Sequence, residues 1–521
     1  MKRVLISVSD KKGIERLAGN LQSSGYRILA SGGTASHLMQ CGIEVERVED
    51  YTHSPELLQG RVKTLHPFIH AGLLARENEE DASDLKRLGI DKIDILICNL
   101  YPFEQTIRKA GALEEEIIEN IDIGGVSLLR AAAKNYLRVL TVSSPDDYDE
   151  VIANLASGFS LKFKERMAVK AFSICAHYDV AITEWLRHHY EQKEAEQLHF
   201  QKMLLLQDGT SLRYGENPHQ MAMSYKNASE QVDGILSAKV LQGKELSYNN
   251  ILDLDVAFRV ATSFSHISAV LVKHQCPTGI AEVKDEKDKA YAIRYAIKSD
   301  PVSAYGGILA LKSEFDAECC KEIEGLFLEC IVAPSFSNEA LGLLAKRKNC
   351  RLLCLSFAQI TKQFEIKSII GGYLLQDIDI VRDEEVESAC YVTNTKLEEE
   401  SLEESFKFAW KASQMIKSNA IVLIQRIGEC EGYYTCGIGG GQPNRVDATR
   451  DALRRAKEEA KGAILASDAF IPFVDTIKEA YKYGIKAVLQ PGGSIRDDEC
   501  IQFCNEHGIA MLFVGMRHFK H

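Results

Sequence analysis

Short apolar runs alternate with amphipathic stretches through the N-terminal part of the chain, and this alternation constrains the fold more than any other feature of the sequence. Residues 4–8, 26–30, 93–100 and 139–142 have the composition of buried strands, and residues 12–23 have the spacing of an amphipathic helix. Apolar strands separated by helices are typical of a parallel sheet with helices on both faces. The sequence therefore predicts an α/β fold that begins with a parallel-sheet domain.

The chain is long enough for more than one domain, because its 521 residues exceed the roughly 150 residues of an average domain several-fold. A polar helical stretch separates the parallel-sheet region from a second region that again mixes strands with helices. We expect domains at residues 1–199 and 200–521. Within the second domain we expect two separate α/β layers, at residues 200–365 and 366–521, joined near the acidic run at 398–404.

The composition limits the classes of partner. The chain has 62 Lys and Arg against 74 Asp and Glu, a formal charge of −12, which argues against a general nucleic-acid binder because phosphate backbones need a basic surface. The 14 cysteines are scattered without a CxxC pair, so no metal site is expected. The N-terminus begins with a strand pattern, and no apolar run approaches the ~20 residues of a membrane span. These features predict a soluble, cytoplasmic protein.

Polar clusters follow the predicted strands of the first domain, where ligands of open α/β sheets usually bind. The clusters are 7–11, 31–34, 60–67, 99–103 and 122–125. The SGGT segment at 31–34 presents backbone N–H groups suited to a phosphate, or it is only a tight turn with Thr34 as a helix cap. Asp122 is either a proton acceptor or a cap of the next helix, and Tyr101 either a functional hydroxyl or a packing residue.

These clusters belong to a longer series of motifs that runs through the chain in order. In the first domain they are SVSDK (7–11), SGGT (31–34), GRVKTLHP (60–67), NLYPF (99–103), DIGG (122–125) and AAAKN (131–135). In the second they are RYGENPHQ (213–220), KHQCPTG (273–279), DPVSAYGGI (300–308), KSNAI (417–421), GIGGGQPNR (437–445), SDAFIPF (467–473), QPGGSIRD (490–497) and MRHF (516–519). Together they resemble the family of bifunctional purine-biosynthesis enzymes that combine IMP cyclohydrolase with AICAR transformylase.

The resemblance implies that residues 1–199 form a methylglyoxal-synthase-like domain that closes formylated AICAR (FAICAR) to IMP. Its implied catalytic residues are Asp122 for the amide proton, Lys134 and Tyr101 for the developing alkoxide, and Lys63 for the carboxamide. The implied substrate-binding residues of this domain are Ser9, Lys11, Ser31, Gly33, Thr34, Arg61, Thr64, Asn99 and Gly124.

The second domain, by the same resemblance, consists of tandem cytidine-deaminase-like subdomains and transfers a formyl group from 10-formyltetrahydrofolate to AICAR. His274 is the implied base, with Lys273 near the formyl oxygen and Asn419 as a further catalytic residue. The implied substrate-binding residues are Arg213, Tyr214, Arg445, Phe470 and Arg517. The resemblance also implies a homodimer, because the family's transformylase site draws on two chains, and it implies no metal.

Other interpretations remain open from the residues alone. A zinc-dependent deaminase would need H-x-E and P-C-x-x-C segments, and the P-C-x-x-C segment does not occur in the chain. The first domain would serve equally as a regulatory module that senses a phosphorylated metabolite, since fold does not decide function. Cys276 beside His274 raises a nucleophile interpretation, which formyl transfer to an amine does not require. Dinucleotide binding is disfavoured because no GxGxxG follows the first strand.

Overall fold

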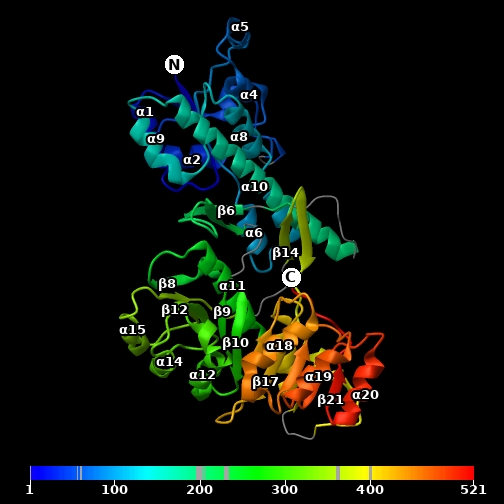
Figure 1. Cartoon of the computed structure of the whole chain (residues 1–521). Helices are drawn as coiled ribbons and strands as arrows, with labels where there is room; N and C mark the ends of the chain where they lie inside the picture. Colours follow the sequence, from blue (N-terminus) through cyan, green and yellow to red (C-terminus); the bar gives the residue numbers. More distant parts are fainter. Residues whose placement is uncertain are drawn as a thin grey trace. The chain divides into compact units, whose positions relative to one another are not determined.

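The computed structural model describes residues 2–55, 57–58, 61–194, 203–204, 206–227, 234–358, 364–397 and 402–521 (Figure 1). It divides into two compact units. The N-terminal unit comprises Met1–Leu206 with Asn227–Glu230, and the C-terminal unit comprises Gln207–Lys226 with Gln231–His521. The expected domain boundary between residues 199 and 200 lies outside the described residues.

The N-terminal unit is built on a five-stranded sheet of order β3-β2-β1-β4-β5, in which every pairing is parallel. Its strands are β1 (Arg3–Val8), β2 (Arg27–Ala30), β3 (Glu46–Arg47), β4 (Ile95–Asn99) and β5 (Leu140–Val142). The predicted parallel sheet is therefore confirmed. Side chains of β1 alternate between two cores, because Val4 and Ile6 enter one and Leu5 enters the other.

Helices supply both cores of this unit. They are α1 (Ile14–Ser23), α2 (Gly32–Gln40), α3 (Val48–Thr52), α4 (Pro67–Leu74), α5 (Glu79–Leu88), α6 (Phe103–Arg108), α7 (Glu114–Glu119), α8 (Gly124–Lys134), α9 (Tyr148–Asn154) and α10 (Leu161–Glu194). Leu17 of α1 and Leu38 of α2 pack in one core, while Leu128 of α8 packs in the other. The sheet is thus covered on both faces, and its polar strand ends meet at one edge.

The C-terminal unit contains a twelve-stranded mixed sheet of order β16-β21-β20-β19-β17-β18-β10-β9-β11-β12-β13-β8. Its strands are β8 (Lys239–Gln242), β9 (Ile267–Lys273), β10 (Cys276–Val283), β11 (Gly307–Leu311), β12 (Leu328–Ala333), β13 (Arg351–Cys354), β16 (Cys390–Tyr391), β17 (Ile421–Arg426), β18 (Gly432–Gly439), β19 (Ile464–Ser467), β20 (Ala487–Gln490) and β21 (Ala510–Phe513). Two further sheets are the hairpins β6 (Leu206–Leu212) with β7 (Ala222–Asn227), and β14 (Phe364–Ile369) with β15 (Gly372–Asp377).

Two halves of the large sheet repeat the same arrangement. Outward from the junction, the first half has the order β10-β9-β11-β12-β13 and the second has β18-β17-β19-β20-β21. In the first half the helices are α11 (Tyr248–Ser263), α12 (Lys289–Ser299), α14 (Ala317–Glu322) and α15 (Asn338–Leu344); in the second they are α17 (Leu402–Gln414), α18 (Arg445–Ala456), α19 (Val474–Lys482) and α20 (Asp497–His507). The chain thus contains tandem α/β subdomains.

The two halves are not separate layers, contrary to expectation, because β10 pairs antiparallel with β18 through Ala281 and Tyr434. The expected division at residues 365 and 366 falls inside β14, and part of the acidic run at 398–404 lies outside the described residues. The division is hard to see in the sequence because the pairing that fuses the halves joins segments about 150 residues apart, beyond any local pattern.

Close packing of helix on strand occurs at the same place in both halves. A Cβ on Gly279 of β10 would lie 1.9 Å from the carbonyl oxygen of Ala296 in α12. A Cβ on Gly439 of β18 would lie 1.8 Å from that of Ala448 in α18. Each glycine therefore allows the helix that follows its strand to approach the sheet. Among the described residues, no helix combines the length and apolar character needed to cross a membrane.

Candidate functional sites

The SGGT segment and Lys63 meet in the N-terminal unit. Ser31 follows β2 and precedes α2, and Gly32 has a φ of +46°. A Cβ on Gly32 would lie 3.0 Å from Lys63 Nζ, so a glycine at this position makes room for the ammonium group. Ser31, Lys63 and His66 line a cavity of about 140 Å³. A lysine beside the N-terminus of a helix is suited to binding a phosphate.

Thr34 supports this segment from within. Its hydroxyl donates to the carbonyl oxygen of Val8 at 3.1 Å and accepts from the Val8 N–H at 3.2 Å. The side chain is buried, and Ser31 rather than Thr34 is the N-cap residue of α2. The interpretation of Thr34 as a cap of its own helix is therefore wrong. Its hydroxyl instead fixes the start of α2 against the end of β1.

Asn99 brings the ends of β1 and β4 together. Its Oδ1 accepts hydrogen bonds from the backbone N–H groups of Ser9, at 2.6 Å, and of Asp10, at 2.9 Å. Its Nδ2 donates to the carbonyl oxygen of Asp10 at 2.8 Å, and Lys11 Nζ lies 3.5 Å from the carbonyl oxygen of Ser9. Ser9, Lys11 and Asn99 thus form one loop cluster, in which the Asn99 amide shapes the backbone.

Asp122 lies at the start of α8 beside Tyr101 and Gly124. Its carboxylate accepts from the Gly125 N–H at 2.6 Å and from the Tyr101 N–H at 3.4 Å. Burial raises the pKa of Asp122, while these two hydrogen bonds act to lower it. A carboxyl group with a raised pKa exchanges protons more readily near neutral pH. A Cβ on Gly124 would lie 3.2 Å from Thr64 Oγ1, which brings the 61–66 loop to the same place.

Two predicted residues of this unit point elsewhere. Lys134 ends α8, whose 11 residues at ~1.5 Å per residue place it roughly 15 Å along the axis from Asp122. Its ammonium group is exposed and has no polar partner among the described residues. Arg61 forms an ion pair with Glu119 of α7, which raises the pKa of the guanidinium and lowers that of the carboxylate.

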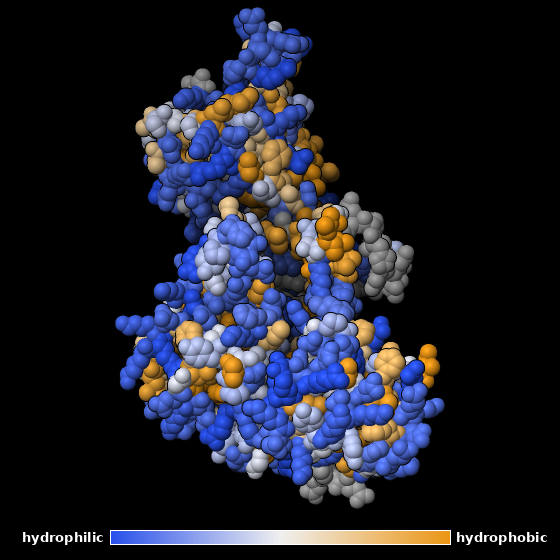
Figure 2. All heavy atoms as spheres, viewed as in Figure 1, coloured by the Kyte–Doolittle hydropathy of each residue, from blue (hydrophilic) through white to orange (hydrophobic). Residues whose placement is uncertain are grey.

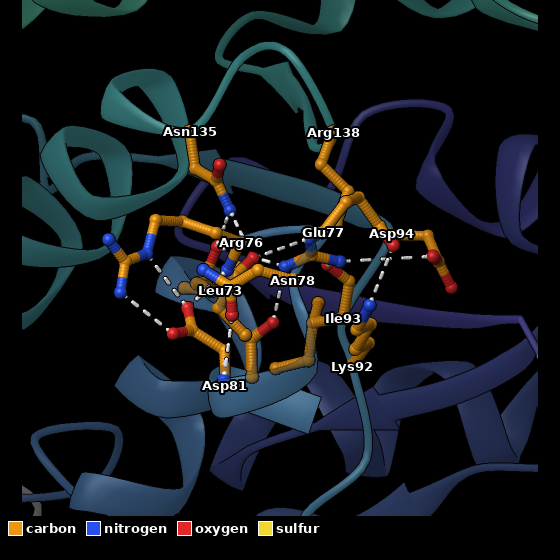
Figure 3. Close-up of polar contacts among 12 residues, drawn as sticks. Leu73, Arg76, Glu77, Asn78, Asp81, Lys92, Ile93, Asp94, Asn135 and Arg138 are labelled. Atoms are coloured by element: carbon orange, nitrogen blue, oxygen red, sulfur yellow. Dashed lines mark hydrogen bonds and ion pairs between the residues drawn. The ribbon is translucent and has the colours of Figure 1, made fainter. Parts of the chain in front are cut away.

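Figure 3 shows how the C-terminal end of α4 and the segment that follows it are held. The guanidinium of Arg138 donates to the carbonyl oxygens of Gly72, Leu73, Ala75 and Ile93. Asn135 Nδ2 donates to two of the same oxygens, at 2.8 and 2.9 Å. These bonds satisfy the last carbonyl groups of α4. They fix the helix whose first turn follows His66, a function that the sequence motif around Asn135 does not reveal.

In the C-terminal unit, Lys273 and His274 lie at the end of β9. Lys273 pairs with Cys276 across the β9–β10 hairpin, so His274 and Gln275 form a two-residue turn. Lys273 Nζ donates to the carbonyl oxygen of Tyr305 at 2.7 Å, and the His274 residue is exposed. Cys276 is also exposed. A base and a cation therefore lie side by side where β9 ends.

Asp253 of α11, which no sequence motif indicates, contacts this turn. Its carboxylate accepts from the N–H of His274 at 3.0 Å and from the N–H of Gln275 at 2.6 Å. The two segments are 21 residues apart in sequence, and LDLD on an amphipathic helix has no distinctive spacing. The sequence offers one signal for such a contact: the turn between the two strands is His-Gln, whereas two-residue hairpin turns usually contain glycine.

Asn419 lies before β17 in a buried polar cluster. Its Oδ1 accepts from the guanidinium of Arg445 at 2.9 Å, and its Nδ2 donates to the carbonyl oxygen of Gln442 at 2.9 Å. Arg445 is 5% exposed and forms an ion pair with the fully buried Asp468. Asp468 also accepts from the Ser418 hydroxyl. The guanidinium of Arg445 is therefore used to hold Asn419 rather than presented to solvent.

Of the remaining predicted residues of the unit, Arg213, Phe470 and Arg517 are exposed and Tyr214 is half-buried. Arg213 donates to the hydroxyl of Tyr214 at 2.7 Å and stacks on its ring, and Arg517 lies over the ring of Phe519. Phe470 follows β19 and is 38% exposed. Three pairing steps separate β9 from β17. At ~4.8 Å per step these correspond to roughly 14 Å. Within one chain the sheet thus keeps Lys273 and His274 apart from Asn419, whereas the tail that carries Arg517 returns toward Asn419, since the Ser418 N–H donates to the carbonyl oxygen of Lys520 at 2.8 Å.

The part of the chain that the structure describes contains no cluster of potential metal ligands. No three His, Cys, Asp or Glu side chains lie together there in a way that could hold an ion.

Comparisons with known proteins cover the whole chain. A family model described as "AICARFT/IMPCHase bienzyme" matches residues 132–455, and one described as "MGS-like domain" matches residues 13–127. The chain is 46% identical over 532 residues to the bifunctional purine biosynthesis protein PurH of Acetivibrio thermocellus, and 44% identical over 525 residues to that of Aquifex aeolicus. In both cases 100% of each chain is covered. A solved structure titled "Crystal structure of ForH" is 38% identical over 35% of this chain and 96% of that chain, with a TM-score of 0.32.

Proposed function

The chain belongs to the AICARFT/IMPCHase bienzyme family, and we propose how its two units divide the two reactions of that family. It is a bifunctional enzyme of purine biosynthesis, with a folate-dependent formyltransferase activity and an IMP cyclohydrolase activity. These activities complete the pathway to IMP. We assign cyclisation to residues 1–199 and formyl transfer to residues 200–521.

Formyl transfer requires a base and an oxyanion donor, because the 5-amino group of AICAR is conjugated with its ring and is a poor nucleophile. His274 takes the amine proton as the nitrogen attacks the formyl carbon. Lys273 stabilises the developing charge on the formyl oxygen, and Asn419 orients the reacting group. The formyl carbon leaves N10 of 10-formyltetrahydrofolate, which receives a proton in exchange. The observation that carries this assignment is the exposed His274 beside Lys273 at the end of β9.

Cyclisation requires a site that binds the phosphate of the substrate and a group that accepts the carboxamide proton. The N-terminus of α2 with Lys63 beside Gly32 supports the first requirement. Asp122, with its raised pKa, supports the second. The carboxamide nitrogen attacks the formyl carbon, and water then leaves. Tyr101 and Lys134 are assigned to the alkoxide by family resemblance, and Lys134 lies at the far end of α8 from Asp122.

A homodimer would bring the separated parts of the transformylase site together. The strands β9 and β17, next to which His274 and Asn419 lie, are roughly 14 Å apart along the sheet of one chain, and a second chain would complete the site. The β14–β15 hairpin also carries exposed apolar side chains, and Figure 2 shows them gathered on this hairpin. They include Ile370, Tyr373 and Leu374. An apolar surface of this kind is typical of an interface between subunits.

The division of labour is tested on the full-length protein with AICAR and 10-formyltetrahydrofolate, and the nucleotides are separated by chromatography. We expect IMP from the unchanged protein and FAICAR from Asp122→Asn. His274→Ala should leave AICAR unchanged yet still convert supplied FAICAR to IMP. If either substitution abolished both reactions in a folded protein, the assignment of one reaction to each unit would be wrong.

Lys134 is tested separately with supplied FAICAR. A cyclisation rate for Lys134→Ala equal to that of the unchanged protein would remove this residue from the proposed site.

A further inference from the structure

The turn that carries His274 has an unusual backbone. His274 has a φ of 54° and Gln275 a φ of 60°, so two consecutive residues other than glycine occupy the left-handed region. Two-residue hairpins of this type normally use Asn or Asp followed by Gly, because glycine adopts positive φ without steric conflict. Glutamine has no such advantage. The turn must therefore be held by contacts outside the hairpin.

Asp253 supplies the contacts. One oxygen of its carboxylate accepts from the His274 N–H at 3.0 Å, and the other accepts from the Gln275 N–H at 2.6 Å. Successive N–H groups converge in this way only when the backbone has the observed curvature, and a negative charge in their focus stabilises it. Charge-assisted hydrogen bonds of this kind are stronger than neutral ones. The carboxylate thus stabilises the strained turn at both of its residues.

The same face of α11 also reaches a second segment of the predicted site. Asn249 lies four residues before Asp253 and therefore one turn away on the same side of the helix. Its Nδ2 donates to the carbonyl oxygen of Glu216 at 3.3 Å, in the loop that contains Arg213 and Tyr214. One helix face thus contacts the backbone of two loops that the function requires.

We propose that Asp253 is a positioning residue for formyl transfer, which fixes the His274–Gln275 turn and so aims the imidazole of His274 at the substrate amine. This inference rests on the proposed role of His274 as the base. Asp253 itself touches neither substrate nor the reacting atoms in this scheme. A loss of its carboxylate would let the turn relax toward negative φ and move the imidazole by an ångström or more, a displacement that costs roughly 100-fold in rate.

The experiment measures kcat and KM for formyl transfer with full-length variants. Asp253→Ala should lower kcat by about 100-fold and Asp253→Asn by about 10-fold, because asparagine keeps one acceptor oxygen. KM for AICAR should change less than kcat, since the substrate-binding residues are unaltered. Asp255→Asn is the matched control: this residue lies on the same helix, forms an ion pair with Arg259, and should change kcat by less than about twofold.

A second substitution separates positioning from other roles. Gln275→Gly removes the steric penalty at positive φ, so Asp253→Asn combined with Gln275→Gly should recover much of the kcat that Asp253→Asn loses. A direct role of the carboxylate in proton transfer would not be rescued in this way. The rescue also keeps the test decisive if Asp253→Ala does not fold.

The inference is overturned if Asp253→Asn retains full kcat, or if glycine at position 275 gives no recovery. His274→Ala distinguishes this failure from failure of the proposed function. Full formyl transfer by His274→Ala would remove His274 as the base, whereas loss of transfer in that variant with normal activity in Asp253→Asn would remove only the role of Asp253.

Discussion

The strands of the large C-terminal sheet begin and end along two opposite sides, which we call the two edges of the sheet. These edges are built from equivalent parts of the repeat, but they differ in the side chains that they expose. Lys273 and His274 end β9 at one edge, where Asn419 precedes β17, because β9 and β17 run antiparallel across the β10–β18 junction. At the opposite edge, His266 precedes β9 as Asn419 precedes β17. A cavity of about 420 Å³ lies there, lined by residues that include His266 and Glu282.

Charges at the opposite edge are compensated within the chain. Lys411 pairs with Asp383 at 2.7 Å, and Lys407 pairs with Glu387 at 2.7 Å. Burial raises the pKa of Glu282, although its hydrogen bond from the His266 N–H acts to lower it. The ring of His274, by contrast, has no polar partner in the described part of the chain. The difference teaches that the repeated scaffold does not decide function. At the first edge Lys273 and Asn419 are held by hydrogen bonds within the chain, while His274 is exposed.

The largest expected effect comes from comparing one histidine substitution at each edge of the sheet. His274→Ala should lower formyl transfer by about 10²- to 10⁴-fold, the usual contribution of a general base. His266→Ala, at the other end of the same strand, should change it by less than about twofold, because its ring is not assigned to the reaction. Steady-state kinetics of both variants test the comparison. Comparable losses in the two would mean that the edges do not differ in the way described.

Next in size is the buried ion pair that holds Asn419. Arg445→Met leaves Asp468 buried without its partner, so the free energy of unfolding of the C-terminal unit should fall by about 3–5 kcal/mol. Lys411→Met at the opposite edge removes a pair whose carboxylate is 40% exposed, and the loss there should be about 1 kcal/mol. Urea denaturation measures both. An equal loss would show that the Asn419 cluster is not the more tightly specified of the two.

A smaller effect tests whether the halves are equivalent in packing. Gly279→Ala and Gly439→Ala should each destabilise the unit by about 1–3 kcal/mol, because the added methyl group meets a backbone carbonyl of the following helix. Gly428→Ala is the control, since a Cβ there meets nothing within 4 Å. Its unfolding free energy should stay within about 0.5 kcal/mol of the parent. Destabilisation at only one of the two strands would break the structural equivalence.

The smallest expected effect concerns pH. Burial lowers the pKa of His518, but hydrogen bonds to Asp379 and Glu385 at 2.8 Å overcome this and raise it above its usual value. The charged imidazole therefore stabilises the fold fully below the pKa of the unfolded chain, near ~6.5, and this stability is lost as pH rises through the folded-state value.

Unfolding free energies measured across this pH range should decline for the parent protein, and the decline should be reduced in His518→Gln. His507→Gln, whose ring contacts the carbonyl oxygen of Phe503 and the rings of Phe503 and Tyr481, should retain the parent's slope. An undiminished slope in His518→Gln would assign the pH dependence to other groups.

Much of the fold could be predicted from continuous apolar runs, because residues 4–8 and 139–142 coincide closely with β1 and β5. The strand ends of the first domain followed from the same runs. What could not be predicted are contacts between segments whose approach depends on helix packing. Asp253 reaches His274 across 21 residues, and Arg445 reaches Asp468 across 23. Such pairs have no local periodicity.

The antiparallel pairing of β10 with β18 has a consequence for how this region can be made. A truncated gene product carrying only one half would expose the edge of β10 or β18, with a row of open backbone N–H and C=O groups along residues that are now largely buried. Such a fragment would be expected to associate with other copies of itself in the cell. The ribosome must therefore synthesise both halves before β10 and β18 can pair and cover each other's open edge.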